Sequence, residues 1–143
     1  MTDHVAHAET RVSASPQQVW DALTDPDAIA TYMMGAKVET DWEEGSPITW
    51  SGEYDGRSYQ DKGEILDVVE NRRLRVTHYS PLSGEDDVPE NYHTLDYRLD
   101  DQGDATVLTL DQDGNDSAEQ AEQFSQNWQQ MLDGLKEYVE SGR

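Results

Sequence analysis

The sequence predicts an α+β fold in which an antiparallel sheet packs against one long C-terminal helix. Three observations predict this class. Two short segments near the N-terminus each begin with a capping residue and a proline, residues 36–111 place apolar residues at every second position, and residues 118–140 place them at helical spacing. We therefore expect one domain, residues 1–143, with the order strand, two short helices, several strands and a long helix.

The first strand and the two short helices are predicted by local signals. Residues 4–14 alternate in part between apolar and polar side chains. Residues 15–18 (Ser-Pro-Gln-Gln) combine a capping box with proline at the first helical position. Residues 25–26 (Asp-Pro) repeat the start signal, and Gly35 is placed to end the second helix. The apolar faces of the two helices are expected to be Val19, Trp20 and Leu23, and Ile29, Tyr32 and Met33.

Residues 36–111 show the alternation that is typical of half-buried antiparallel strands. Residues 55–56 (Asp-Gly) are a hairpin signal before a long strand over about 58–69. A polar loop over residues 80–91 interrupts the series, and a turn at residues 101–104 separates the last two strands. These signals predict a meander with one face toward a core.

The C-terminal helix is predicted from a second capping box, residues 117–120 (Ser-Ala-Glu-Gln), to about Glu140, and Gly142 is placed to end it. Its apolar side chains follow the spacing of one buried stripe, which suits a helix lying across a whole sheet. They are Ala121, Phe124, Trp128, Met131, Leu132, Leu135 and Val139.

The charge of the chain excludes several partners. It carries 31 Asp and Glu against 10 Lys and Arg, a formal net charge of -21 at pH 7. Nucleic-acid binding needs clustered Lys and Arg, and an anionic membrane surface repels such a chain. No stretch approaches the ~18 apolar residues of a membrane span, and the N-terminus shows no signal-peptide pattern. We expect no nucleic-acid partner, no membrane insertion and a cytoplasmic location.

The acidic residues are spread through every segment, whereas lysine occurs only three times. This pattern resembles that of proteins from salt-accumulating organisms, where a Debye length of ~3 Å at 1 M salt screens self-repulsion. The alternative is an ordinary acidic protein. We favour halophilic adaptation because the charge is dispersed and lysine is scarce.

Metal and cofactor sites are not predicted. The chain has no cysteine, which excludes disulfides, thiolate metal sites and a cysteine nucleophile. Residues 111–116 (Asp-Gln-Asp-Gly-Asn-Asp) suggest a calcium loop, but glycine stands at the fourth position instead of the sixth, and a strand precedes the segment. We interpret this segment as a solvated acidic turn.

Four segments carry a resemblance to a known family. Residues 12–26 (VSASPQQVWDALTDP) resemble the opening of START-like domains of the SRPBCC superfamily, in the group related to the activator of the heat-shock protein 90 ATPase. Residues 63–68 (GEILDV), 73–77 (RLRVT) and 127–136 (NWQQMLDGLK) are similar to later parts of the same domains. The resemblance covers essentially the whole chain.

The resemblance implies a helix-grip fold, in which the sheet wraps around the C-terminal helix and leaves an elongated cavity. Superfamily members bind sterols, lipids, polyketides and other hydrophobic ligands there, and some are cyclases, hydrolases or co-chaperones. This chain resembles the C-terminal domain of the eukaryotic ATPase activators. The implied function is binding of a hydrophobic small molecule; the alternatives are a co-chaperone or protein-interaction module with a chaperone as partner, and a small cyclase or hydrolase.

Strand alternation and the helical stripe predict which side chains face such a cavity. Aromatic rings supply apolar walls, while tyrosine hydroxyls and histidine nitrogens orient a ligand. The ligand-binding candidates are Tyr32, Met33, Trp50, Tyr54, His78, His93, Tyr97, Phe124, Trp128, Met131 and Leu135. The alternative is that these residues fill the core. His78 and His93 are also of the type used for acid–base chemistry, but no nucleophile or carboxylate pair accompanies them in the sequence, so no catalytic residue is predicted.

Overall fold

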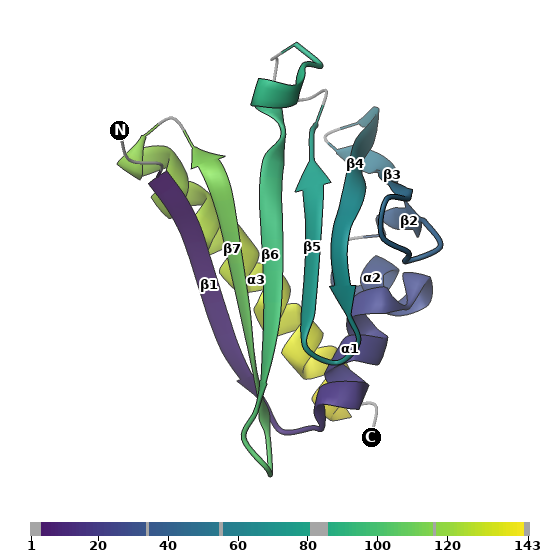
Figure 1. The fold of residues 1–143 in the computed structure, drawn as a ribbon, viewed down its shortest axis with the longest axis vertical. Helices are drawn as coiled ribbons and strands as arrows, with labels where there is room; N and C mark the ends of the chain where they lie inside the picture. The colour runs from purple at the N-terminus through teal and green to yellow at the C-terminus, as the bar shows by residue number, and fades with distance from the viewer. Residues whose placement is uncertain (1–3, 34, 55, 81–85, 116, 142–143) are drawn as a thin grey trace.

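The computed structural model describes residues 4–33, 35–54, 56–80, 86–115 and 117–141, with Tyr54 and Pro89 described by their backbone alone. Within them a seven-stranded sheet curves around one long helix (Figure 1). The elements are β1 (His4–Val12), α1 (Pro16–Thr24), α2 (Pro26–Tyr32), β2 (Lys37–Glu39), β3 (Pro47–Tyr54), β4 (Arg57–Val69), β5 (Arg73–His78), the 3-10 turn η2 (Pro89–Asn91), β6 (His93–Asp101), β7 (Thr106–Asn115) and α3 (Ala118–Ser141).

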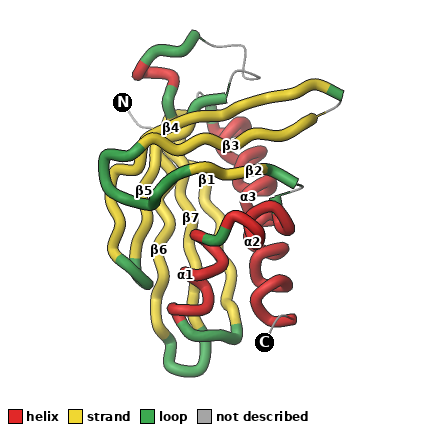
Figure 2. The backbone as a smooth tube through the Cα atoms, turned by 90° about the vertical axis from the view of Figure 1, so that its right-hand side faces the viewer, coloured by secondary structure: helices red, strands yellow, loops and turns green. Residues whose placement is uncertain are grey.

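The strands are ordered β1-β7-β6-β5-β4-β3-β2, and every neighbouring pair is antiparallel. The helix α3 lies along one face of this sheet, while α1 and α2 cover the same side near its C-terminal end (Figure 2). The predicted α+β class and helix-grip fold are confirmed, including the two short helices after the first strand.

The helices begin where the capping signals predict. Gln18 N donates to Ser15 Oγ over 3.2 Å, and Ser15 N donates to the Gln18 side chain over 3.1 Å. Asp25 caps α2 by accepting a hydrogen bond from Asp27 N, and Gly35 follows α2 with a φ of +85°, which a residue with a side chain rarely adopts. Each helix start is therefore stabilised by contacts within a few residues.

The prediction of a solvated turn over residues 111–116 is wrong, because β7 continues to Asn115. The strand β1 reaches this far and pairs His4 with Asn115, whose side-chain amide donates to the carbonyl of His4 over 2.8 Å. Gln112 and Asn115 are buried. Pairing between distant strands therefore outweighs the local turn signal.

Some positions that carried sequence predictions lie outside the described residues. They are Asp55 of the hairpin signal, residues 81–85 of the polar loop, Asp116 and Gly142.

The helix α3 covers the free edge of β1 with polar side chains. The Gln129 amide accepts from Glu9 N over 3.2 Å and donates to Glu9 O over 2.9 Å. Further along, the Lys136 ammonium donates to Arg11 O over 2.7 Å. These bonds satisfy backbone groups that an edge strand leaves unpaired, and they hold α3 against one side of the sheet. Space between helix and sheet is left on the other side, over β3, β4, β5 and β6.

Candidate functional site

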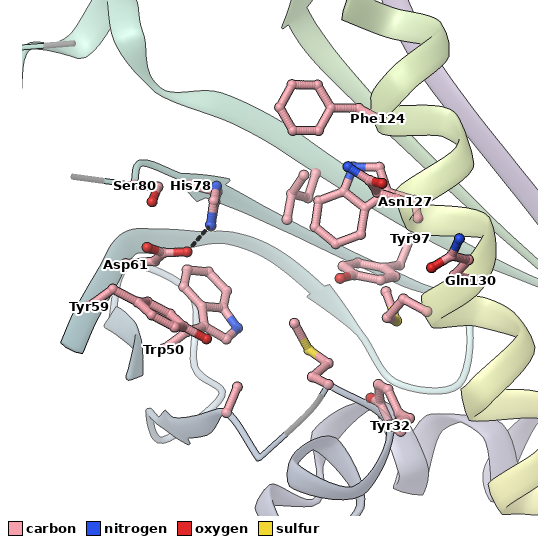
Figure 3. Close-up of a pocket in the computed structure, with 15 residues that line it drawn as sticks. Tyr32, Trp50, Tyr59, Asp61, His78, Ser80, Tyr97, Phe124, Asn127 and Gln130 are labelled. Carbon is pink, nitrogen blue, oxygen red and sulfur yellow. Dashed lines mark hydrogen bonds and ion pairs between the residues drawn. The ribbon is translucent and has the colours of Figure 1, made fainter. Parts of the chain in front are cut away.

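A cavity of about 500 Å³ lies between the N-terminal half of α3 and the inner face of the sheet, with α2 at one end (Figure 3). Pockets for small molecules in proteins have roughly this volume, about 300–1,000 Å³. Eight of the eleven side chains predicted to face a cavity line this one. They are Tyr32, Met33, Trp50, His78, Tyr97, Phe124, Trp128 and Met131.

The other three predicted residues are placed differently. His93 lines a smaller adjoining cavity of about 230 Å³, and its Nδ1 lies 2.7 Å from the carbonyl of Asp113. Leu135 does not reach the cavity, because it is fully buried in the core between α3 and the sheet. Tyr54 belongs to β3, but its side chain lies outside the described part of the structure.

Seven lining residues were not predicted: Ala36, Tyr59, Asp61, Ser80, Leu95, Asn127 and Gln130. Two of them had a signal in the sequence. Counting back in steps of two along the long strand from the apolar Ile65 leads to Asp61 and Tyr59, so all three side chains belong to one face. Aspartate is usually exposed, so Asp61 does not suggest an inward-facing position. Most of the other residues in this part of the strand are polar as well, and the alternation is therefore hard to recognise.

Asp61 and His78 form a hydrogen-bonded pair in the cavity wall. Asp61 Oδ2 lies 2.9 Å from His78 Nε2, and the two side chains are only 15% and 18% exposed. Because a carboxylate only accepts hydrogen bonds, Nε2 carries the proton. The second oxygen, Asp61 Oδ1, is shielded from solvent and has no hydrogen-bond partner among the described residues. Among the described residues, therefore, only one of the two carboxylate oxygens has a hydrogen-bond partner.

Gly63 explains why these two side chains meet. A Cβ atom at this position would lie 1.8 Å from the carbonyl oxygen of Thr77, so only glycine lets β4 approach β5 so closely. The hydroxyl of Thr77 also accepts a hydrogen bond from Glu64 N over 2.8 Å. The close approach lies two residues from Asp61 in β4 and one residue from His78 in β5, and it brings their side chains together.

Two tyrosines supply neutral hydroxyl groups to the cavity wall. Burial raises the pKa of Tyr97 and that of Tyr32 well above the ordinary value for tyrosine, and the nearby Tyr97 phenol contributes to the shift of Tyr32. The Tyr32 hydroxyl donates to the carbonyl of Ala22 over 2.9 Å. The Tyr97 hydroxyl points into the cavity instead (Figure 3). Tyr97 is thus available as a hydrogen-bond donor to a bound molecule.

The aromatic walls are held by specific contacts. The indole Nε1 of Trp128 donates to the side-chain oxygen of Gln112, which is buried in β7. The Trp50 ring meets the His78 ring edge-on, with 5.1 Å between centroids. The hydrogen bond of Trp128 and the ring contact of Trp50 each favour one orientation of the indole. The result is a cavity with six tyrosine, tryptophan and phenylalanine rings and few polar groups.

Within the described residues, no group of three or more His, Asp or Glu side chains is placed to hold a metal ion. No helix in that part of the chain is long and apolar enough to cross a membrane.

A sequence profile of the family named Activator of Hsp90 ATPase homolog 1-like protein matches residues 13–140. The chain belongs to this family. The resemblance to START-like SRPBCC domains is thereby confirmed, and the family is compatible with ligand binding, with cyclase-type chemistry and with association with Hsp90. No curated protein matches the chain in sequence.

Solved structures of similar proteins support this assignment. A protein from Cytophaga hutchinsonii, solved in solution, is 39% identical, with a TM-score of 0.86 over 99% of this chain and 98% of that chain. The Aha1 dimer from Colwellia psychrerythraea is 17% identical, with a TM-score of 0.74 over 100% and 99% of the two chains. DynU16, from the dynemicin biosynthetic locus, is 23% identical, with a TM-score of 0.80 over 99% of this chain and 49% of that chain. The last two share the fold alone.

Proposed function

We propose that the protein binds a hydrophobic small molecule, such as a lipid or polyketide, in the cavity between α3 and the sheet. The observation that carries this proposal is the cavity of about 500 Å³ with mainly aromatic and apolar walls. A few polar groups, among them the Tyr97 hydroxyl and the Asp61–His78 pair, stand where they would orient a ligand. Binding of an apolar ligand is favourable because it removes apolar surface of both the ligand and the cavity wall from water.

The test is retention of a ligand by the purified protein. The protein is incubated with a lipid and metabolite extract in molar salt, and native mass spectrometry identifies what stays bound. Ala36→Phe places a ring at the cavity wall, whereas Ala30→Phe adds the same ring at a half-buried position of α2 that does not line the cavity. We expect a defined added mass with the wild type and Ala30→Phe, and its loss with Ala36→Phe. An empty wild type, or equal retention by both variants, would contradict the proposal.

Binding to a chaperone ATPase is a second candidate function, and the family match favours it. The measurement is the ATPase rate of an Hsp90-class chaperone with and without the protein, together with co-purification of the two. A higher rate that Ala36→Phe leaves unchanged would place the activity on the surface of the domain instead of in the cavity. An unchanged rate and no co-purification would remove this candidate.

A cyclase or hydrolase activity is a third candidate, and the hydrogen bond between Asp61 and His78 inside the cavity favours it. A histidine held by a carboxylate is a common general base. The test compares the masses in an extract after incubation with the wild type and with His78→Ala. Products that form only with the wild type, with a pH-dependent rate, would support catalysis; identical product sets would rule against it.

Adaptation to high salt is a separate proposal about where the protein works. Apart from Asp61 in the cavity wall, the described Asp and Glu side chains are at least partly exposed, and the chain has 31 Asp and Glu against 10 Lys and Arg, so repulsion between carboxylates is not balanced. Salt at molar concentration shortens the Debye length to ~3 Å and screens this repulsion. We expect the melting temperature to rise from millimolar to molar potassium chloride. A melting temperature that is indifferent to salt would contradict the proposal.

A further inference from the structure

We infer that the cavity selects an organic cation, namely a ring-containing hydrophobic molecule that carries one ammonium group. The inference rests on the proposed function and names the chemical class of its ligand. The observations that carry it are the charge of the cavity wall, the unpartnered oxygen of Asp61 and the aromatic rings beside it.

The wall of the cavity carries one carboxylate, Asp61, which is hydrogen-bonded to His78 but faces no permanently charged basic group. Among the described lining residues there is no Lys or Arg, and Asp61 is the one carboxylate. An anionic ligand, such as a fatty acid or a phosphate ester, would lie near this carboxylate in surroundings that screen charge poorly, so repulsion would weaken its binding. A cation in the same position would be attracted. The negative charge of the cavity wall therefore favours cationic over anionic ligands.

Asp61 is also incompletely satisfied by the side chains and backbone that the structure describes. His78 uses Oδ2, while Oδ1 is shielded from solvent and has no hydrogen-bond partner among the described residues. A buried carboxylate that lacks a full set of partners is unfavourable. An ammonium group in the adjoining cavity would offset that charge, and a small rotation of the carboxylate would let Oδ1 accept its hydrogen bond. A neutral ligand can provide the hydrogen bond but not the charge.

Aromatic rings lie next to the position that the cationic group would occupy. Figure 3 shows Trp50 and Tyr59 next to Asp61 at one end of the cavity. The electron-rich faces of such rings attract ammonium groups, most strongly when water is excluded. Gly52 makes room for the Tyr59 ring, since a Cβ at that position would lie 2.8 Å from the Tyr59 hydroxyl. Carboxylate and aromatic rings together form a recognised environment for organic cations.

The rest of the wall suits the hydrophobic part of the same molecule. Met33, Leu95 and Met131 provide apolar and polarisable surface without charge. The ligand would then place its ammonium group toward Asp61 and its rings toward these side chains. The net charge of -21 adds a field that raises the local concentration of cations at low salt, but this effect is not specific to the cavity.

The test uses three probes with one ring system: naphthylmethylamine, naphthylmethanol and naphthylacetic acid. Their affinities for the folded protein are measured by isothermal titration calorimetry at moderate salt and above the titration range of ordinary imidazole. We expect the amine to bind about tenfold or more tightly than the alcohol, and the acid to bind most weakly. Asp61→Asn is expected to remove the advantage of the amine and to leave the affinity of the alcohol within about twofold.

Glu137→Gln is the matched control, because it removes the same charge from an exposed position of α3 that does not line the cavity. It should leave all three affinities unchanged, and a loss of amine binding in this variant would show that only the general field acts. If Asp61→Asn does not fold, the order of the probes on the wild type decides. Equal binding of amine and alcohol would overturn the inference and leave the proposed function standing. Failure of all three probes would overturn the inference, and the extract experiment would then decide the proposed function separately.

Discussion

The two halves of α3 show the same spacing of apolar residues but have different surroundings. In the C-terminal half Leu132 and Leu135 are fully buried and belong to the core. In the N-terminal half Phe124 and Trp128 are only partly buried, and both line the cavity. The difference comes from what covers each half. The helices α1 and α2 lie beside the C-terminal half, whereas the N-terminal half faces the open inner surface of the sheet (Figures 1 and 2).

This comparison shows that an apolar stripe does not distinguish a packed core from a ligand cavity. Both need apolar side chains at helical spacing. The polar groups near the stripe make the distinction: the cavity half has Asn127 beside it, Gln130 just beyond its end and Asp61 opposite, while the packed half has apolar side chains around it. We therefore expect substitutions in the packed half to change stability, and those in the cavity half to change binding.

The largest loss of stability is expected for Leu135→Ala. Removing a fully buried leucine from a close-packed region costs about 2–5 kcal/mol, through lost burial and the void that remains. The free energy of unfolding is measured by urea denaturation, and ligand retention is measured under conditions where the variant is folded. Retention should be unchanged. A loss below about 1 kcal/mol would show that this half is less well packed than the structure indicates.

Gly63→Ala is expected to cost about 1–3 kcal/mol, because the new methyl group would overlap the carbonyl oxygen of Thr77 and force β4 and β5 apart. Gly52→Ala is the matched control on the neighbouring strand. There the methyl group would meet the end of the Tyr59 side chain, which can swing aside, so its cost should stay below about 1 kcal/mol. Denaturation midpoints compare the two variants. Equal losses would contradict the idea that the close approach of β4 and β5 is the tight point near the cavity.

The parts of the fold that follow from contacts within a few residues could be predicted from the sequence. The capping residues Ser15 and Ser117 give the starts of α1 and α3, since each hydroxyl accepts a hydrogen bond from the backbone N–H three residues further on. Strand alternation likewise identifies the inner faces that carry Trp50 and Tyr97.

Features that depend on pairing between distant segments could not be predicted. The end of β7 is set by its pairing with β1, which overrides the turn signal in residues 111–116. The contact between Asp61 and His78 depends on how closely β4 approaches β5 at Gly63, and nothing local indicates this distance. Leu135 and Phe124 were both expected at the cavity, because the stripe alone does not show where α1 and α2 lie.

Phe124→Ala is expected to have the opposite profile to Leu135→Ala. The ring is already partly exposed and faces the cavity, so its removal should cost no more than about 1 kcal/mol of stability. Ligand retention should fall, because the ring forms part of the wall. Denaturation and native mass spectrometry are compared on the same preparation. A large loss of stability with full retention would assign Phe124 to the core and contradict the division of α3 into two halves.

Tyr97→Phe is expected to have the smallest effect at neutral pH and a distinct effect at alkaline pH. Burial raises the pKa of Tyr97 in the folded protein, while the phenol titrates near its ordinary value of about 10 in the unfolded chain. The unfolded state therefore loses its proton first. The contribution of this group to the free energy of unfolding is present below about pH 10. It is lost as pH rises toward the folded pKa, by about 1.4 kcal/mol per pH unit.

Replacing the Tyr97 phenol with phenylalanine removes this contribution, so the free energy of unfolding should fall less steeply above about pH 10. The slope should not vanish, because the pKa of Tyr32 is raised as well. Identical slopes for both proteins would mean that the Tyr97 hydroxyl is open to water, and the cavity would then be wetter at its centre than its aromatic walls indicate.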